Sequence, residues 1–307
     1  MNIIFNALGC GLGNNGGTKT IVKSVEALNS LGHSASIHYN ANRYTWEGDV
    51  VSVMADGEDI SRADAVVNVS VWDVDSTLKL PTKKKVWWLR GWEQWVRGEK
   101  FLIEKIKEFH NSGGEFIVNS SWLIEQLREK CGVDSVLCHS GLDLGYWKPL
   151  TMHTDKITVG ALWHPKHKTK NYHMFEAVKK HFENNEMYIF QTIHGNLTQP
   201  QMRAQYGGCN VWLSLSELEG FHQCPAEAAL CGCNIIYYNV NSGGTRDYCS
   251  HETATPFDTV DELITAIETY VPNKVKRDKM ETVLVREIGN REINMGMFVN
   301  IIEGRVV

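Results

Sequence analysis

Short apolar runs alternate regularly with longer amphipathic stretches along this chain, and this alternation constrains its fold most strongly. Runs rich in Val, Ile, Phe and Trp predict buried strands, and apolar residues three to four positions apart predict helices. Strands are expected at residues 3–8, 35–39, 65–71, 86–89, 116–119, 157–161, 187–192, 211–215 and 235–238. Helices are expected at residues 18–31, 101–110, 122–131, 172–181, 200–206, 225–231, 260–270 and 293–303. Strands that alternate with helices predict an α/β fold with parallel, doubly wound sheets.

The alternation stops near Pro149 and restarts at Ile157, and the residues between them are polar and lack periodicity. A length of 307 residues fits two domains, because single domains usually have about 100–200 residues. We therefore expect an N-terminal Rossmann-like domain at residues 1–150, a second one at residues 151–290, and a C-terminal helix within residues 291–307. Between two such domains, ligands bind at the carboxyl ends of the strands.

The composition is that of a soluble globular protein, with 43% hydrophobic and 22% charged residues. The net charge of −5 gives no general attraction to nucleic acid or to an anionic membrane. Eight scattered cysteines indicate free thiols in a reducing compartment, and Cys231 and Cys233 are too close for the usual zinc spacing. No run approaches the roughly 18 apolar residues of a membrane span, and the first residues lack a basic leader. We therefore expect a cytoplasmic protein that does not insert into membranes.

A glycine-rich loop at residues 11–17 (GLGNNGG) lies between the first expected strand and helix. Its backbone N–H groups and the helix N-terminus can face a phosphate, and the spacing matches the dinucleotide fingerprint. A dinucleotide site needs an acidic residue at the end of the second strand, where residues 38–40 are His, Tyr and Asn and the next acid is Glu47. We therefore favour a phosphate site over an NAD site, and a plain tight turn remains an alternative.

Two glutamates flank a predicted helix N-terminus in the second half of the chain. A strand ends at Leu215, a loop carries Glu219 and Gly220, and Pro225 suits the first helical turn, which then includes Glu227. Such a site can bind a sugar diphosphate, because the helix N-terminus attracts the phosphates and the carboxylates accept hydrogen bonds from sugar hydroxyls. Alternatively, one carboxylate only complements the helix dipole and the other is solvated.

The run ELEGFHQCPAEAALCG at residues 217–232 resembles the signature of retaining glycosyltransferases of the GT-B fold, the "group 1" or family 4 class. Further segments resemble that family in order: the glycine loop followed by LNSLGHSASIH, VNSSWLIEQLREKCG, HSGLDLGYWKP, TVGALWHPKHKTKN, NSGGTRDY and TPFDTVDELITAIETY. The resemblance covers nearly the whole chain. It implies two Rossmann-like domains facing across a cleft, the acceptor in the first, the donor in the second, and a terminal helix that crosses back to the first.

The resemblance also implies roles for single residues of the donor domain. Glu227 matches the glutamate that holds the nucleotide ribose, Glu219 the one that contacts the transferred sugar, and Lys170 the phosphate-binding lysine. The remaining donor contacts are expected from Gly16, Gly17, Gly220, Phe221 and His222.

Three positions depart from the family pattern. The usual arginine is replaced by Ala161, and Lys166, Lys168 and His164 are candidates for the missing positive charge. The second glycine of the signature is replaced by His222, which adds a side chain close to the donor. In the N-terminal domain, Arg90 occupies the place of a frequent histidine, and we expect it to be catalytic and to face the cleft together with Glu93.

Two further motifs suggest other ligands. Residues 79–107 contain nine Lys and Arg against three Asp and Glu, interleaved with tryptophans. Such a segment can bind nucleic acid or stack on sugar rings, unless the tryptophans are core residues and the lysines are solvated. The pair Asp73 and Asp75 offers too few oxygen ligands for a divalent metal, so we expect a polar loop there and no metal site.

The sequence as a whole predicts a retaining, metal-independent glycosyltransferase that moves a sugar from a UDP- or GDP-sugar to a hydroxyl acceptor, a saccharide by default. The nucleotide-sugar is a co-substrate, and no further cofactor is expected. One alternative is a DNA glycosyltransferase that acts on a hydroxymethylated base, which would have to be flipped out of the duplex. Another is a nucleotide-sugar or nucleic-acid binding module without catalysis, which the alanine at position 161 suggests.

Overall fold

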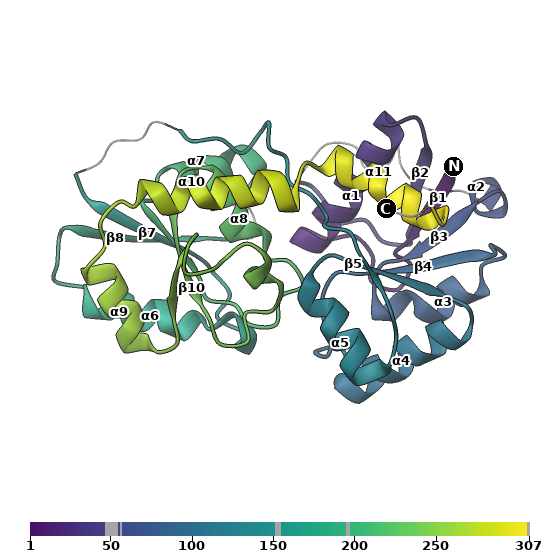
Figure 1. Cartoon of the computed structure of the whole chain (residues 1–307), viewed down its shortest axis with the longest axis horizontal. Coiled ribbons are helices and arrows are strands. Elements are labelled where there is room, and N and C mark those ends of the chain that lie inside the picture. The colour runs from purple at the N-terminus through teal and green to yellow at the C-terminus, as the bar shows by residue number, and fades with distance from the viewer. Residues whose placement is uncertain (47–54, 56, 151–154, 195–196, 306–307) are drawn as a thin grey trace. The chain divides into compact units, whose positions relative to one another are not determined.

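A computed structural model describes residues 1–46, 55, 57–150, 155–194 and 197–305 of the chain. The chain divides into two compact units (Figure 1). Unit 1 comprises Met1–Gly141 and Asn290–Val307, and unit 2 comprises Leu142–Gly289. Each unit contains a parallel sheet with helices, so the predicted α/β class with two doubly wound sheets is confirmed.

Among the described residues, the sheet of unit 1 has the strand order β2-β1-β3-β4-β5-β6, with parallel pairs throughout. The strands are β1 (Asn2–Asn6), β2 (Ser34–His38), β3 (Ala65–Asn68), β4 (Lys84–Leu89), β5 (Glu115–Val118) and β6 (Val136–Leu137). The helices are α1 (Gly16–Ser30), α2 (Gly57–Ser61), the 3-10 helix η2 (Val71–Asp73), α3 (Val74–Lys79), α4 (Glu99–Asn111), α5 (Ser121–Cys131) and α11 (Arg291–Ile302). The strand order reverses between β1 and β3, where sheets of this kind bind ligands.

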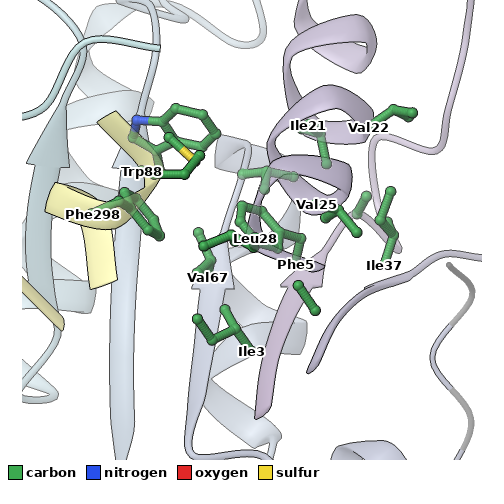
Figure 2. Close-up of a cluster of buried hydrophobic side chains, with 14 of the residues drawn as sticks. Ile3, Phe5, Ile21, Val22, Val25, Leu28, Ile37, Val67, Trp88 and Phe298 are labelled. Atoms are coloured by element: carbon green, nitrogen blue, oxygen red, sulfur yellow. The ribbon is translucent and has the colours of Figure 1, made fainter. Parts of the chain in front are cut away.

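Aromatic side chains from three separate elements meet in the core of unit 1 (Figure 2). The ring of Trp88 on β4 lies 6.2 Å from that of Phe5 on β1 and 5.3 Å from that of Phe298 on α11, between centroids. All three side chains are fully buried. Burial of an aromatic side chain contributes roughly 1.5–3 kcal/mol, so the C-terminal helix is held in unit 1 although unit 2 precedes it in the chain.

The described part of unit 2 has the parallel strand order β11-β10-β9-β7-β8. The strands are β7 (Ile157–Leu162), β8 (Tyr188–Ile193), β9 (Val211–Ser214), β10 (Asn234–Tyr238) and β11 (Thr255–Phe257). The helices are η3 (Lys168–Lys170), α6 (Tyr172–His181), α7 (Gln199–Gly207), α8 (Gln223–Leu230), η4 (Gly243–Asp247), α9 (Val260–Glu268), α10 (Lys274–Val283) and η5 (Leu284–Ile288). Because β9 pairs with β7, the loops that follow these two strands are neighbours, although β8 lies between them in the sequence.

The boundary between the units lies after Gly141, earlier than the position near residue 150 expected from the sequence. The reason is packing, because Leu142 and Trp147 are buried in the core of unit 2. The ring of Trp147 lies 5.6 Å from that of Tyr206 on α7. The polar break that motivated the expected boundary therefore lies within unit 2, and its residues 151–154 lie outside the described residues, as does Glu47.

Two local predictions in unit 1 are wrong. The stretch with Asp73 and Asp75 is helical, in η2 and α3, because Ser70 caps η2 by accepting from the amide of Trp72. The strand expected at residues 86–89 begins two residues earlier, so Lys84 and Lys85 belong to β4 itself.

Three general expectations can be compared with the structure. All eight cysteines are free thiols, as predicted. Within the described ranges, no helix is long and apolar enough to cross a membrane. The same part of the chain contains no group of three or more His, Cys, Asp or Glu side chains arranged to hold a metal ion.

Candidate functional site

Three loops meet at the carboxyl edge of the sheet of unit 2 and hold Glu219 between them. The loop after β9 is tied to the loop after β7 by the amide of Glu217, which donates to the Thr169 carbonyl at 2.8 Å. It is tied to the loop after β10 by the amide of Leu218, which donates to the Asn241 carbonyl at 2.7 Å. Glu219 therefore lies in a rigid loop at the edge where parallel sheets bind ligands.

The glycine pair after β10 packs directly on the backbone of Glu219. The amide of Gly244 donates to the Glu219 carbonyl at 2.7 Å. Gly243 has a φ of +62°, and a Cβ there would lie 2.4 Å from the same carbonyl oxygen. Only a residue without a side chain fits this position, which explains why the sequence has glycine there.

Lys170 and Glu219 form a mostly buried ion pair in this site. The Lys170 ammonium contacts Oε1 of Glu219, and the two side chains are 24% and 17% exposed. The neighbouring Asn171 has a φ of 47° and donates from Nδ2 to the Leu215 carbonyl at 3.1 Å, which fixes the backbone next to Lys170. Burial alone would raise the pKa of Glu219, but the Lys170 ammonium and hydrogen bonds from Lys170 and Ser216 lower it to about 2. Glu219 is therefore ionised at neutral pH.

His222 adds a neutral polar group beside this pair. Its Nδ1 lies 3.0 Å from Oγ of Ser214, and its Nε2 lies 3.9 Å from Oε1 of Glu219. Burial, together with the charge of Lys170, lowers the pKa of His222 to about 4 even though Glu219 opposes the shift. Within the described residues Nε2 is buried without a hydrogen-bond partner. Buried polar atoms usually have a partner, so Nε2 is available for a hydrogen bond with a bound water or ligand.

Glu227 lies deeper than the sequence suggested. Helix α8 begins at Gln223, so Pro225 is in the first turn as expected, but Glu227 is in the second. Its side chain is 2% exposed and accepts a hydrogen bond from the hydroxyl of Tyr206 at 3.4 Å. The N-cap residue His222 makes no side-chain cap hydrogen bond, so the helix N-terminus is not closed by its own cap.

The other predicted residues of unit 2 differ in burial. Gly220 and Phe221 are buried, and the ring of Phe221 lies 5.4 Å from that of Tyr248. Lys166 is exposed. Ala161 is fully buried in the core, and Lys170 is the cation that contacts Glu219.

The predicted residues of unit 1 form a second group. Gly16 and Gly17 are exposed in the first turn of α1. Arg90 donates to the carbonyl of Gly17 at 2.6 Å and to that of Val69 at 3.0 Å. It thus ties the start of α1 to the loop after β3, and the structure gives it a clamping role within unit 1.

Sequence reasoning missed the buried acid Asp73 next to this clamp. Asp73 is fully buried and accepts a hydrogen bond from the amide of Gly9. Burial raises its pKa to about 6, although hydrogen bonds from Gly9 and Cys10 and the charge of Arg90 oppose the shift. The available signal was the spacing of Val71 and Val74, which is typical of a helix and not of a polar loop.

Asp73 should make the stability of the protein depend on pH. Because its pKa in the folded state is raised from 3.8 to about 6, its stabilising effect is present below pH 3.8 and is lost as the pH rises through about 6. Relative to Asp73→Asn, the free energy of unfolding should fall by about 1–3 kcal/mol between about pH 4 and pH 8. Urea unfolding of both proteins at the two pH values measures this. If the free energy of unfolding had the same pH dependence in both proteins, the raised pKa of Asp73 would be contradicted.

The residues of the basic, tryptophan-rich segment 79–107 differ in burial and in position on the sheet. Trp87, Trp88 and Trp92 are buried core residues, as in the alternative weighed above, whereas Trp95 is 66% exposed. Lys84 and Lys85 begin β4 and Lys83 directly precedes it, so these three lysines lie at the amino edge of the sheet. There Lys84 pairs with Glu115. This is the edge opposite the one where parallel sheets bind ligands, so the lysines give no support to a DNA acceptor.

Comparisons with known proteins agree on the fold. No family model matches the sequence, and neither does any curated protein. Sucrose-phosphate synthase from Thermosynechococcus elongatus is similar in structure, with a TM-score of 0.70, 13% identity and 98% of both chains covered. HepE from Anabaena, solved with UDP and glucose, has a TM-score of 0.74 at 10% identity over 99% of both chains. The lipopolysaccharide outer core galactosyltransferase WaaB has a TM-score of 0.71 at 13% identity over 100% of both chains. This chain therefore has the GT-B glycosyltransferase fold.

Proposed function

We propose that this protein is a retaining glycosyltransferase that transfers a sugar from a nucleotide-sugar to a hydroxyl acceptor without a metal ion. The observation that carries the proposal is the group of Lys170, Glu219 and His222 at the carboxyl edge of a GT-B donor-type sheet. A mostly buried cation, an ionised carboxylate and an unpartnered ring nitrogen together suit a ligand that combines phosphates with sugar hydroxyls.

The donor would bind in unit 2. Lys170 and the N-terminus of α8 favour the diphosphate, because both present positive charge or N–H groups to it. Glu219 is ionised and accepts hydrogen bonds from the hydroxyls of the sugar. Glu227, near the start of the same helix, accepts from the ribose hydroxyls of the nucleotide.

The reaction would break the bond between the anomeric carbon of the donor and the diphosphate oxygen. Negative charge then grows on the diphosphate, and the ammonium of Lys170 stabilises it. The acceptor oxygen bonds to the anomeric carbon on the same face, and its proton moves to the leaving phosphate, so the configuration is retained. Lys170 and the helix N–H groups would supply the positive charge that a metal ion supplies in other enzymes.

The test is a panel of UDP- and GDP-sugars incubated with the protein in the presence of a chelator. Structures of HepE contain UDP with glucose or UDP-glucose, which makes UDP-glucose the first donor to try. We expect the nucleotide to be released and the new glycosidic bond to be axial, as in the donor. NMR measures both results. Turnover that requires added metal would reject the metal-independent mechanism, and no binding of any donor would reject the function.

The proposal predicts that Glu227→Gln binds the donor about 10- to 100-fold more weakly, because a hydrogen bond to a charged group contributes roughly 1.5–3 kcal/mol. Calorimetry with the accepted donor measures this. The matched control is Tyr206→Phe, which removes the internal hydrogen bond to Glu227 and leaves the carboxylate in place. If both variants lost the same amount of donor affinity, Glu227 would contribute through packing and not through a hydrogen bond to the ribose.

A further inference from the structure

The carboxyl edge of the sheet of unit 1 carries exposed aromatic side chains. Trp72 follows β3 and is 44% exposed, and Trp95 follows the neighbouring strand β4 and is 66% exposed. Large exposed aromatic side chains at the ligand-binding edge of an α/β sheet are typical of binding surfaces. The proposed chemistry in unit 2 does not use these residues.

The two loops that carry the tryptophans are held together by a partly buried carboxylate. Oε2 of Glu93, in the loop after β4, accepts from the amide of Val71 at 2.6 Å and lies 3.3 Å from Oγ of Ser70. Gly9 lets the loop after β1 approach Trp72, since a Cβ at Gly9 would lie 2.5 Å from the Trp72 carbonyl oxygen. The position of Trp72 is therefore set before any ligand arrives.

Arg97 places a positive charge on this surface. Its guanidinium lies 5.1 Å from the ring centre of Trp72 and 5.2 Å from that of Phe101. These ring contacts orient the guanidinium, and Arg97 is exposed. A planar guanidinium held in this way suits a carboxylate or phosphate, which it binds through two parallel hydrogen bonds.

We propose that Trp72, Trp95 and Arg97 form the acceptor site, and that the acceptor is a saccharide that carries a carboxylate or a phosphate. The rings stack on the apolar faces of the sugar, and Arg97 pairs with its anionic group. This inference rests on the proposed function and adds the class of acceptor. Arg90 and Glu93 are positioning residues, because they hold the loops and not the sugar.

The experiment compares three tetrasaccharides of similar size: a neutral one, one with a uronic acid and one with a phosphate monoester. Binding of each to the protein is measured by calorimetry, and the KM of each as acceptor is measured with a saturating donor. The wild type should prefer the charged saccharides. Arg97→Ala should raise the KM for them by about tenfold or more, through loss of a charged hydrogen-bonded pair, and leave the neutral one nearly unchanged. Trp72→Ala should weaken all three.

Matched controls separate this site from general effects. Arg128→Ala removes an arginine of unit 1 with a 70% exposed side chain, and Ile293→Ala removes a 67% exposed apolar side chain of the same unit. Neither should change any KM. Hydrolysis of the donor by water should be the same in all four variants, because it needs only the donor site.

The outcomes are distinguishable. If no donor is hydrolysed but the charged saccharides bind and Arg97→Ala abolishes that binding, the proposed reaction fails and this site stands. If the neutral and charged saccharides bind equally to the wild type, or none binds, the acceptor class is wrong. If short duplex DNA binds through Arg97 in place of the saccharides, the acceptor is a nucleic acid and the inference is overturned.

Discussion

Replacing Lys170 by Ala should lower the kcat of sugar transfer by about 100- to 1,000-fold, the loss typical for a group that stabilises charge in the transition state. Lys170 is largely buried and touches Glu219, so solvent cannot replace its charge fully. The KM for the donor should change less than kcat, because the charge on the diphosphate grows as the bond breaks. Steady-state kinetics with the accepted donor measure both constants.

Lys170→Ala should also change the pH dependence of kcat/KM. In the wild type the depressed pKa of Glu219, about 2, keeps its contribution to stability complete above the ordinary pKa of 4.5, and this contribution is lost only as the pH falls through about 2. Without the ammonium, burial remains and raises the pKa, so the acid limb of kcat/KM should move to higher pH. Lys166→Ala is the matched control, since Lys166 is exposed, and it should reduce kcat only slightly. A control variant as slow as Lys170→Ala would refute the special role of Lys170.

Gly243→Ala should destabilise the protein by about 3 kcal/mol or more. The left-handed backbone at a φ of +62° costs alanine roughly 1–2 kcal/mol, and the added Cβ would overlap the Glu219 backbone, at 2.4 Å from its carbonyl oxygen. Relief of this overlap must move the loop that carries Glu219, so donor hydrolysis should fall as well. Thermal and urea unfolding, with activity measured below the transition, follow both effects.

The matched control for this change is Gly296→Ala. Gly296 is helical and a Cβ there meets nothing within 4 Å, so alanine should stabilise α11 by about 0.5–1 kcal/mol. If the two substitutions shifted the unfolding transition equally and in the same direction, the tight approach at Gly243 would be disproved.

The sequence by itself determined most of the elements and the candidate loops. Helix α6 has the predicted bounds, because the apolar side chains that it buries, such as Met174, Phe175 and Val178, recur at helical spacing. The strands were visible because a parallel sheet is covered on both faces, which requires continuous apolar runs. Lys170 and Glu219 were identified from a resemblance in the residues around them, and not from any local pattern that pairs them.

The tertiary structure decided which of these residues meet. Strand β9 pairs with β7, and only this order brings Lys170 to Glu219 across 49 positions of sequence. Hydrophobic periodicity shows which face of one element is buried, but it does not show which other elements pack against that face. For the same reason the sequence did not reveal that Asp73 is buried or that the lysines before Val86 lie at the amino edge of the sheet, and the return of the C-terminal helix to unit 1 was expected only from the resemblance. These facts depend on strand order and on packing between distant segments, which the folded chain alone establishes.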